Sequence, residues 1–166
     1  MTSRTRTLLI AGALVALVLL PGSSSAASLI QKFEGLKLTP YYDVNGWAVG
    51  YGSHYNYDAG RAVRQTDKID AQTALKWLKL RIAEDEQILD RLVKVPITRN
   101  QRDSLLSLMY NIGSGNFQRS NLLAKLNNGR PIHEVADEFD GWNTADGRVL
   151  PELTRRRAIE KKLFLS

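Results

Sequence analysis

The sequence predicts a predominantly helical α+β protein, in which a small β-hairpin lobe and a larger helical lobe are joined by a long helix. Asn45-Gly46, a dipeptide that favours a two-residue hairpin turn, lies between two runs of strand-forming residues. Residues 71–93 carry apolar side chains at helical spacing, and four further segments with this spacing follow residue 97. At 166 residues, the chain is long enough for one domain of this kind.

The first 27 residues are predicted to lie outside this fold. Two arginines precede an uninterrupted apolar run at residues 8–20, and small residues follow as far as Ala27. A basic start, a short apolar run and small residues are typical of a secretory signal. The 13 residues of the run are fewer than the roughly 20 that span a membrane comfortably. We therefore assign residues 1–27 to targeting and residues 28–166 to the folded domain.

The folded domain is expected to begin with a short helix and a hairpin. Residues 28–34 have apolar side chains at helical spacing, and Gly35 is a typical C-terminal stop. Strands at residues 41–43 and 47–49 flank the Asn45-Gly46 turn. A helix end and a hairpin rim can face each other across a cleft, so this stretch is a candidate site.

The long helix is predicted to connect the two lobes. Residues 53–68 are expected to be irregular or to hold a short further strand that completes the small lobe. Asp70 is a good N-cap for the helix over residues 71–93. We expect the charges of this helix, at residues 84–86 and at Asp90, to form a solvated face.

Capping residues delimit the helices of the larger lobe. Thr98 and Gln101 form a capping box that opens a helix with a buried apolar stripe. Gly129 stops the next helix, and Pro151 suits the first turn of the last one. The predicted helices are residues 98–112, 120–128, 131–139 and 151–164.

Glu34 and Asp43 are candidate catalytic carboxylates. They lie nine positions apart in a stretch that is otherwise mostly apolar, aromatic or Gly. A carboxyl group in such surroundings is poorly solvated, which disfavours its charged form and suits a general acid. Gly50 and Gly52 would let a backbone or a ligand approach closely. The alternative is that both carboxylates are ordinary solvated surface charges.

Composition restricts the other classes of function. The chain has no Cys, which excludes disulfides and Cys-ligated metal, and His54 and His133 alone offer little for a His-rich site. Arg4 and Arg6 supply two of the six net positive charges, which leaves +4 for the remainder. That charge suits an anionic cell-wall polymer, nucleic acid or simple solubility. No helix-turn-helix, RNP or zinc signature supports nucleic acid.

The candidate site resembles that of the phage-type lysozymes, the endolysins that cut host peptidoglycan. Their signature is a Glu-Gly pair, a Tyr and an Asp about nine residues later, and a hairpin that ends Trp-Thr-Ile/Val-Gly-Tyr-Gly-His. Here the pair is Glu34-Gly35, the Asp is Asp43, and residues 47–54 read Trp-Ala-Val-Gly-Tyr-Gly-Ser-His. The chain departs from the pattern at Ala48, where the family has Thr, and at Ser53, where it has His.

The second half of the chain resembles the same family. Its motifs are V-P-x-T-x-x-Q from Val95, N-x-G-x-G from Asn111, and a W-N…G…L-P…R-R-R ending that starts at Trp142. Glu152 stands where the family usually has Gly. The three arginines of the ending, residues 155–157, suit a solvated helix face, salt bridges beside the core or substrate contacts. Several motifs in the right order make the resemblance specific from Leu29 to the C-terminus.

The resemblance implies a two-lobe lysozyme-like fold that hydrolyses the β-1,4 bond between N-acetylmuramic acid and N-acetylglucosamine. Glu34 would protonate the leaving oxygen, and Asp43 would stay ionised to position water or stabilise the transition state. The family suggests inversion, but the distance between the carboxyl groups would decide between inversion and retention. No metal or organic cofactor is implied, and we expect a monomer whose partner is peptidoglycan. The substrate-binding residues implied are Tyr42, Trp47, Gly50, Tyr51 and Asn143.

Three alternatives stay open at this point. The chain could be a lytic transglycosylase, which needs the acid but no water in the same place. It could also be a peptidoglycan-binding protein with impaired catalysis, because Ala48 lacks the family's water-orienting hydroxyl unless Asn45, Ser53 or His54 replaces it. Finally, residues 1–27 resemble the signal-anchor-release segment of some phage endolysins. Such a segment tethers the enzyme to the host inner membrane and then releases it to the periplasm, whereas a signal peptide is cleaved.

Overall fold

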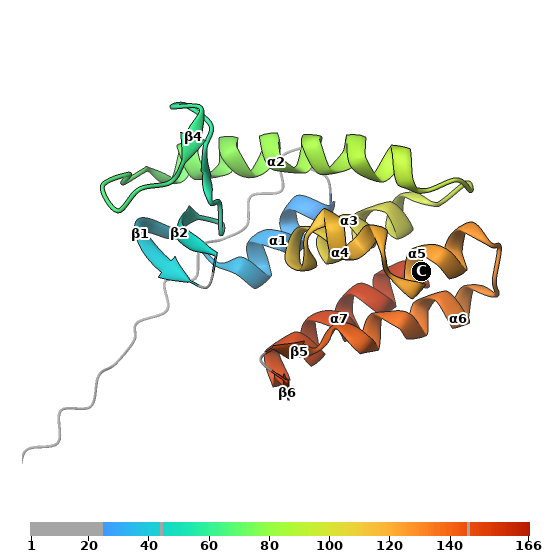
Figure 1. Cartoon of the computed structure of the whole chain (residues 1–166). Helices are drawn as coiled ribbons and strands as arrows, with labels where there is room; N and C mark the ends of the chain where they lie inside the picture. The colour runs from blue at the N-terminus through green and yellow to red at the C-terminus, as the bar shows by residue number, and fades with distance from the viewer. Residues whose placement is uncertain (1–24, 44, 146) are drawn as a thin grey trace, which may run out of the picture.

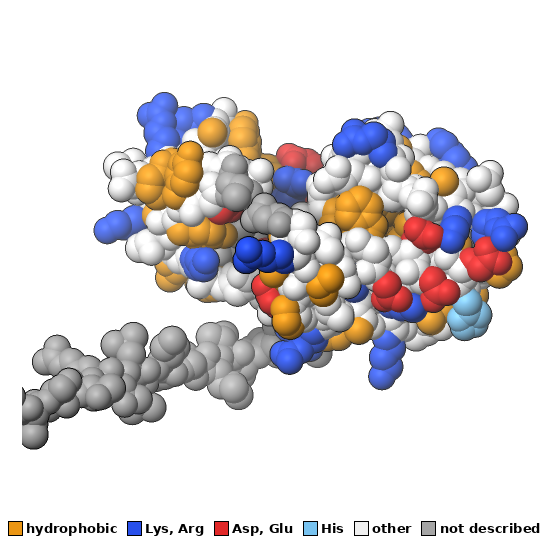
Figure 2. All heavy atoms as spheres, turned by 60° about the horizontal axis from the view of Figure 1, so that its bottom comes forward, with side chains coloured by type: hydrophobic (Ala, Val, Ile, Leu, Met, Phe, Trp, Pro, Cys, Tyr) orange, Lys and Arg blue, Asp and Glu red, His pale blue; other side chains and the backbone are white. Residues whose placement is uncertain are grey.

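The computed structural model describes residues 25–43, 45–145 and 147–166 of the chain. Small antiparallel hairpins form one lobe and helices form the other, and a long helix, α2, runs along both (Figure 1). The space-filling view shows the two lobes as separate masses with a notch between them, and Lys and Arg side chains lie on both (Figure 2). The predicted α+β architecture is confirmed.

The first helix, α1 (Ser25–Glu34), begins before Ser28, where the sequence places the start of the folded domain. Ala26 and Ala27 are only 0% and 4% exposed, because the first turn packs into the core. The backbone N–H of Ala26 also donates a hydrogen bond to Asp103. The predicted targeting segment otherwise lies outside the described residues. Among the residues that the structure describes, no helix is both long and apolar enough to cross a membrane.

The hairpin consists of β1 (Lys37–Asp43) and β2 (Gly46–Gly50). Its register pairs Asp43 with Gly46, so Gly46 belongs to the second strand. The predicted turn centred on Asn45-Gly46 is therefore wrong by one residue. Because Asp43 is the last paired residue of β1, its carboxylate stands at the rim of the hairpin.

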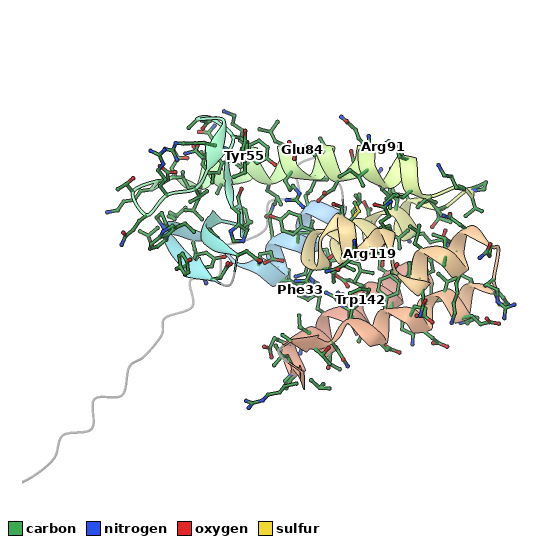
Figure 3. The ribbon with its side chains drawn as sticks, viewed as in Figure 1. Phe33, Tyr55, Glu84, Arg91, Arg119 and Trp142 are labelled. Atoms are coloured by element: carbon green, nitrogen blue, oxygen red, sulfur yellow. The ribbon has the colours of Figure 1, made fainter. Side chains whose placement is uncertain are left out.

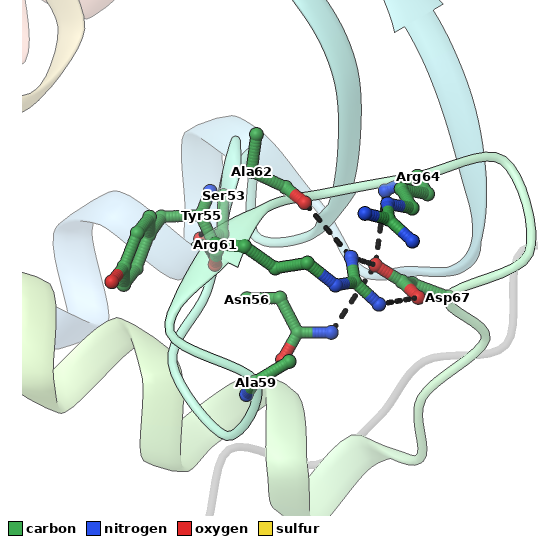
Figure 4. Close-up of polar contacts among 8 residues, drawn as sticks. All are labelled: Ser53, Tyr55, Asn56, Ala59, Arg61, Ala62, Arg64 and Asp67. Carbon is green, nitrogen blue, oxygen red and sulfur yellow. Dashed lines mark hydrogen bonds and ion pairs between the residues drawn. The ribbon is translucent and has the colours of Figure 1, made fainter.

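A second hairpin, with β3 (Tyr55–Asn56) and β4 (Arg61–Ala62), completes the small lobe, where at most one short strand was predicted. Asp67 fastens it by accepting hydrogen bonds from the Arg61 guanidinium, at 2.7 and 3.0 Å, and from Asn56, at 3.2 Å (Figure 4). The Arg61 contact, together with the backbone N–H of Arg64, holds the pKa of Asp67 well below its usual value.

The long helix α2 (Ala71–Leu92) has Asp70 as its N-cap, as predicted. Glu84 and Arg91 lie along it in Figure 3, and the Tyr57 hydroxyl donates to Glu84 at 2.9 Å. The prediction that all its acidic residues are solvated is wrong for Asp85, which is 2% exposed. Arg81, one turn earlier, donates to Asp85 at 3.0 Å and compensates for its burial.

The helical lobe follows the predicted order, with the Thr98–Gln101 capping box present. One short helix, α4, was not predicted. A 3-10 helix, η1, extends the predicted helix beyond its expected end at Phe139. A small hairpin, whose two strands have two residues each, precedes the last helix. The elements are α3 (Arg99–Ile112), α4 (Ser114–Gln118), α5 (Asn121–Asn127), α6 (Ile132–Asp137), η1 (Glu138–Trp142), β5 (Thr144–Ala145), β6 (Arg148–Val149) and α7 (Pro151–Phe164).

Three apolar clusters hold the lobes against α2. The largest fills the helical lobe, around buried side chains of α3, α5 and α6 such as Leu105, Leu123 and Val135. A second cluster, around Ile30 and Leu78, packs α1 on the middle of α2. The third cluster attaches the small lobe to the start of α2 through Val49, Val63 and Trp77. Each buried side chain of this size contributes roughly 1.5–3 kcal/mol, so α2 fixes the hairpin relative to the helices.

Candidate active site

Glu34 is the last residue of α1, and its side chain is 22% exposed. One carboxylate oxygen, Oε1, accepts a hydrogen bond of 2.7 Å from the Arg156 guanidinium on α7. The same guanidinium lies over the Phe33 ring, 4.9 Å from its centroid. Glu34 is therefore partly solvated and fixed by a cation, whereas the sequence suggested an apolar pocket.

Gly52 explains how a carboxylate fits at the end of α1. A Cβ at this position would lie 3.4 Å from Glu34 Oε2, in van der Waals contact with the carboxylate. Gly52 also has φ of 80°, in the left-handed region where residues with side chains are strained. Gly52 thus lets the Oε2 side of Glu34 lie against the loop after β2.

Asp43 lies at the end of β1, so the second carboxylate comes from the hairpin, whereas Glu34 comes from α1. Oδ1 accepts a hydrogen bond of 2.8 Å from the backbone N–H of Asn45. Oδ2 lies 3.4 Å from Nε2 of His54, and the Asp43 side chain is 34% exposed. Both oxygens of the carboxylate are therefore oriented by neighbours while the group still reaches solvent.

The Tyr41 hydroxyl lies within electrostatic range of both carboxylates. Burial raises the pKa of its hydroxyl, and the negative charges of Asp43 and Glu34 raise it further, so the ring lies near both. The Lys37 ammonium sits over the ring, 3.7 Å from its centroid. Tyr41 was not among the predicted site residues, although the family signature includes a Tyr near the Asp. Its position two residues before Asp43 was the available signal, because alternate residues of a strand share a face.

Ala48, the departure from the family pattern, pairs with Tyr41 across the hairpin and is 0% exposed. It therefore shares the strand face of Tyr41 and Asp43, with its methyl group buried. The methyl group of Ala48 can make no hydrogen bond, so the hydroxyl that the family pattern has at this position is absent here.

Arg156, which holds Glu34, belongs to a buried network of ion pairs on α7. Arg156 also donates to Glu160 at 3.0 Å, and Glu160, which is 0% exposed, accepts from the Ser107 hydroxyl at 2.6 Å. Arg157 Nε faces Glu160 at 3.0 Å, as an ion pair without hydrogen-bond alignment, and its guanidinium donates to Asn111 at 2.8 Å. The network links α1, α3 and α7.

Burial dominates the electrostatics of this network. Burial lowers the pKa of Arg157 to about 10, although Glu160 opposes the change. Burial likewise raises the pKa of Glu160, against the opposing effect of both arginines. Of the three arginines in the ending motif, Arg155 is exposed, while Arg156 and Arg157 form salt bridges in the core. The interpretation as a solvated face is thus wrong for the latter two.

Two of the predicted substrate-binding residues, Tyr42 and Trp47, form a pair on the hairpin. They are register partners, and their rings meet edge to face at 5.3 Å between centroids. Trp47 leans on the cluster that attaches the small lobe to α2, whereas Tyr42 is 70% exposed. Tyr42 thus offers a free aromatic face, while the opposite strand face carries Tyr41 and Asp43.

The other three predicted substrate-binding residues, Gly50, Tyr51 and Asn143, make contacts that hold the fold together. Gly50 is buried, and a Cβ there would lie 3.2 Å from Ala74 on α2, so the glycine allows close packing. Tyr51 packs against the cluster between α1 and α2, and its carbonyl accepts from the Tyr110 hydroxyl at 2.6 Å. Asn143 follows η1 at the base of the β5–β6 hairpin, where its carbonyl accepts from the backbone N–H of Leu150 at 2.9 Å.

Residues 31–160 match the family described as phage lysozyme. One relative is the endolysin of Bacillus phage B103, which is 37% identical over 147 residues that cover 87% of this chain and 54% of the relative. The chain thus spans about half the length of that relative and of the endolysin of Bacillus phage PZA. A second is the SAR-endolysin of Enterobacteria phage P21, 32% identical over 91% of this chain and 86% of its own length.

The fold has solved counterparts as well. The muramidase domain of SpmX from Asticaccaulis excentricus superposes with a TM-score of 0.77 and 35% sequence identity, over 87% of this chain and 97% of that domain. The match covers both lobes. The arrangement of hairpin lobe, long helix and helical lobe is therefore shared with a protein described by its action on a muramic acid polymer.

Proposed function

This chain belongs to the phage lysozyme family, and we propose that it is a muramidase that hydrolyses peptidoglycan during lysis of a phage host. The bond cut is the β-1,4 bond between N-acetylmuramic acid and N-acetylglucosamine. The observation that carries the proposal is the pairing of Glu34 and Asp43 around Tyr41, one carboxyl group fixed by Arg156 and the other at the hairpin rim. The names of the relatives, endolysin and muramidase, support the same reaction.

In the proposed reaction, Glu34 donates a proton to the leaving glycosidic oxygen. Oε1 faces Arg156, so the proton is carried by Oε2, which lies beside Gly52. Asp43 stays ionised and positions the attacking water or stabilises the oxocarbenium-like transition state. We propose inversion at the anomeric carbon, and the exposed Tyr42 ring as a stacking surface for a sugar.

Release of soluble fragments from purified peptidoglycan tests the proposal against a binding-only function. The full chain is incubated with insoluble peptidoglycan, and the muropeptides in the supernatant are quantified. An active muramidase releases them in proportion to enzyme and time. Sedimentation of the chain with the polymer, without release, would instead support a binding protein that has lost catalysis, the function that Ala48 would favour.

We further propose that residues 8–27 tether the enzyme to the host inner membrane and later release it to the periplasm. The SAR-endolysin relatives support this localisation. The burial of Ala26 and Ala27 means that insertion and complete folding exclude each other, since a turn that packs in the core cannot also lie in a bilayer. Insertion would withdraw this turn from α1 and leave Asp103 without the Ala26 N–H. The tethered state would then lack a complete α1, the helix that ends at Glu34.

Membrane fractionation before and after an uncoupler tests this localisation. We expect a full-length protein in the membrane fraction, which becomes soluble and active when the membrane potential collapses. N-terminal sequencing of the released protein distinguishes the two targeting segments. A protein that already starts near Ala27 or Ser28, and is soluble and active before the uncoupler, would show a cleaved signal peptide and exclude the tether.

A further inference from the structure

His54 lies on the loop between β2 and β3, one residue after the position where the family has His. Its ring is held between two groups of the hairpin. Nδ1 lies 3.1 Å from the carbonyl oxygen of Trp47, and Nε2 lies 3.4 Å from Oδ2 of Asp43. The side chain is 38% exposed, so the ring stands at the surface of the site.

The two partners of the His54 ring restrict which of its nitrogens can carry a proton. The Trp47 carbonyl can only accept a hydrogen bond, so Nδ1 must carry a proton. In the neutral ring Nε2 would then point a lone pair at the Asp43 carboxylate, which is unfavourable. The imidazolium form has protons on both nitrogens and satisfies the carbonyl and the ionised carboxylate together. The protonated ring can therefore form an ion pair with the Asp43 carboxylate while Nδ1 donates to the Trp47 carbonyl.

We propose that His54 is a positioning residue for Asp43, and that it takes the place of the missing hydroxyl at Ala48. The inference rests on the proposed muramidase function. With Oδ1 held by the Asn45 N–H, the His54 contact at Oδ2 restricts rotation of the carboxylate. The nearby Ser53 hydroxyl donates instead to the Tyr55 carbonyl at 2.8 Å. His54 thus holds the Asp43 carboxylate in the orientation in which it faces the water or transition state.

The expected effect is a loss of turnover rather than of substrate affinity. Losing this ion-pair contact should lower kcat on the order of tenfold, with KM little changed. His54→Arg, which provides N–H donors and a positive charge, should retain more activity than His54→Ala. In an Asp43→Asn background, His54→Ala should cost no further activity, because its action passes through Asp43. His133→Ala is the matched control, since His133 is exposed on α6.

The experiment measures kcat and KM of these variants on purified peptidoglycan, and the ring ¹⁵N chemical shifts of both histidines by NMR. Asp43→Asn should shift the His54 signals and leave those of His133 in place. Equal losses from His54→Ala with and without Asp43, or unchanged His54 signals in the Asp43→Asn protein, would overturn the proposal. The NMR result decides the pairing even if the wild type proves inactive, in which case the muramidase function alone has failed.

Discussion

Glu34→Gln is expected to lower the rate of peptidoglycan hydrolysis by about 10²–10⁴-fold, the usual contribution of a general acid. The amide keeps the shape of the side chain, and its oxygen can still accept from Arg156, but it has no acidic proton for the leaving oxygen. The rate is measured as release of soluble muropeptides at saturating enzyme and at several substrate loads.

The folding of this variant is the necessary control. Arg156 keeps its contact with Glu160 in Glu34→Gln, so we expect a folded protein with a circular dichroism spectrum like that of the wild type. Glu152→Gln, an exposed change in the first turn of α7, is the matched control and should leave the rate unchanged. A folded Glu34→Gln protein with near-normal release would show that Glu34 is not the acid.

Glu160→Ala is expected to destabilise the fold by roughly 3–5 kcal/mol, the usual cost of breaking a buried ion pair by removing one partner. Glu160 is 0% exposed and lies between Arg156 and Arg157, so its loss leaves the buried Arg157 without a carboxylate partner and Arg156 with Glu34 alone. Because Arg156 also holds Glu34, activity should fall in the same variant even where it remains folded. The measurement is urea denaturation followed by circular dichroism.

Two further variants separate charge from packing in this network. Glu160→Gln keeps most of the side-chain volume and one acceptor for Ser107 or Arg156, so its cost should lie between wild type and Glu160→Ala. Glu152→Ala on the exposed start of the same helix should change stability by no more than about 0.5 kcal/mol. A loss below about 1 kcal/mol for Glu160→Ala would mean that water or neighbouring groups compensate the two arginines.

Local signals made much of the fold predictable. The Asp70 cap and the Thr98–Gln101 capping box fix where helices begin, and both are present in the structure. The hairpin was placed correctly, but its register was one residue off, since pairing depends on how the strands pack as well as on the turn dipeptide. Glu34 at a helix end and Asp43 at a hairpin rim follow from those two elements.

The burial of charged residues was the main feature that the sequence did not predict. Apolar spacing cannot identify the inner face of α7, because that face consists of Arg156, Arg157 and Glu160 as well as Phe164. Their spacing of three and four residues was a usable signal for ion pairs on one helix face. Nothing local indicated that Arg156 meets Glu34, which is 122 residues away in the chain.

The most direct test of the account is product analysis by mass spectrometry after digestion of purified peptidoglycan in H₂¹⁸O. Hydrolysis with Glu34 as acid and a water held at Asp43 predicts fragments that end in reducing N-acetylmuramic acid, each with one ¹⁸O at the new anomeric hydroxyl. Fragments with 1,6-anhydro ends and no ¹⁸O would contradict the account, because they would show that the muramic acid's own hydroxyl, and not water, attacks.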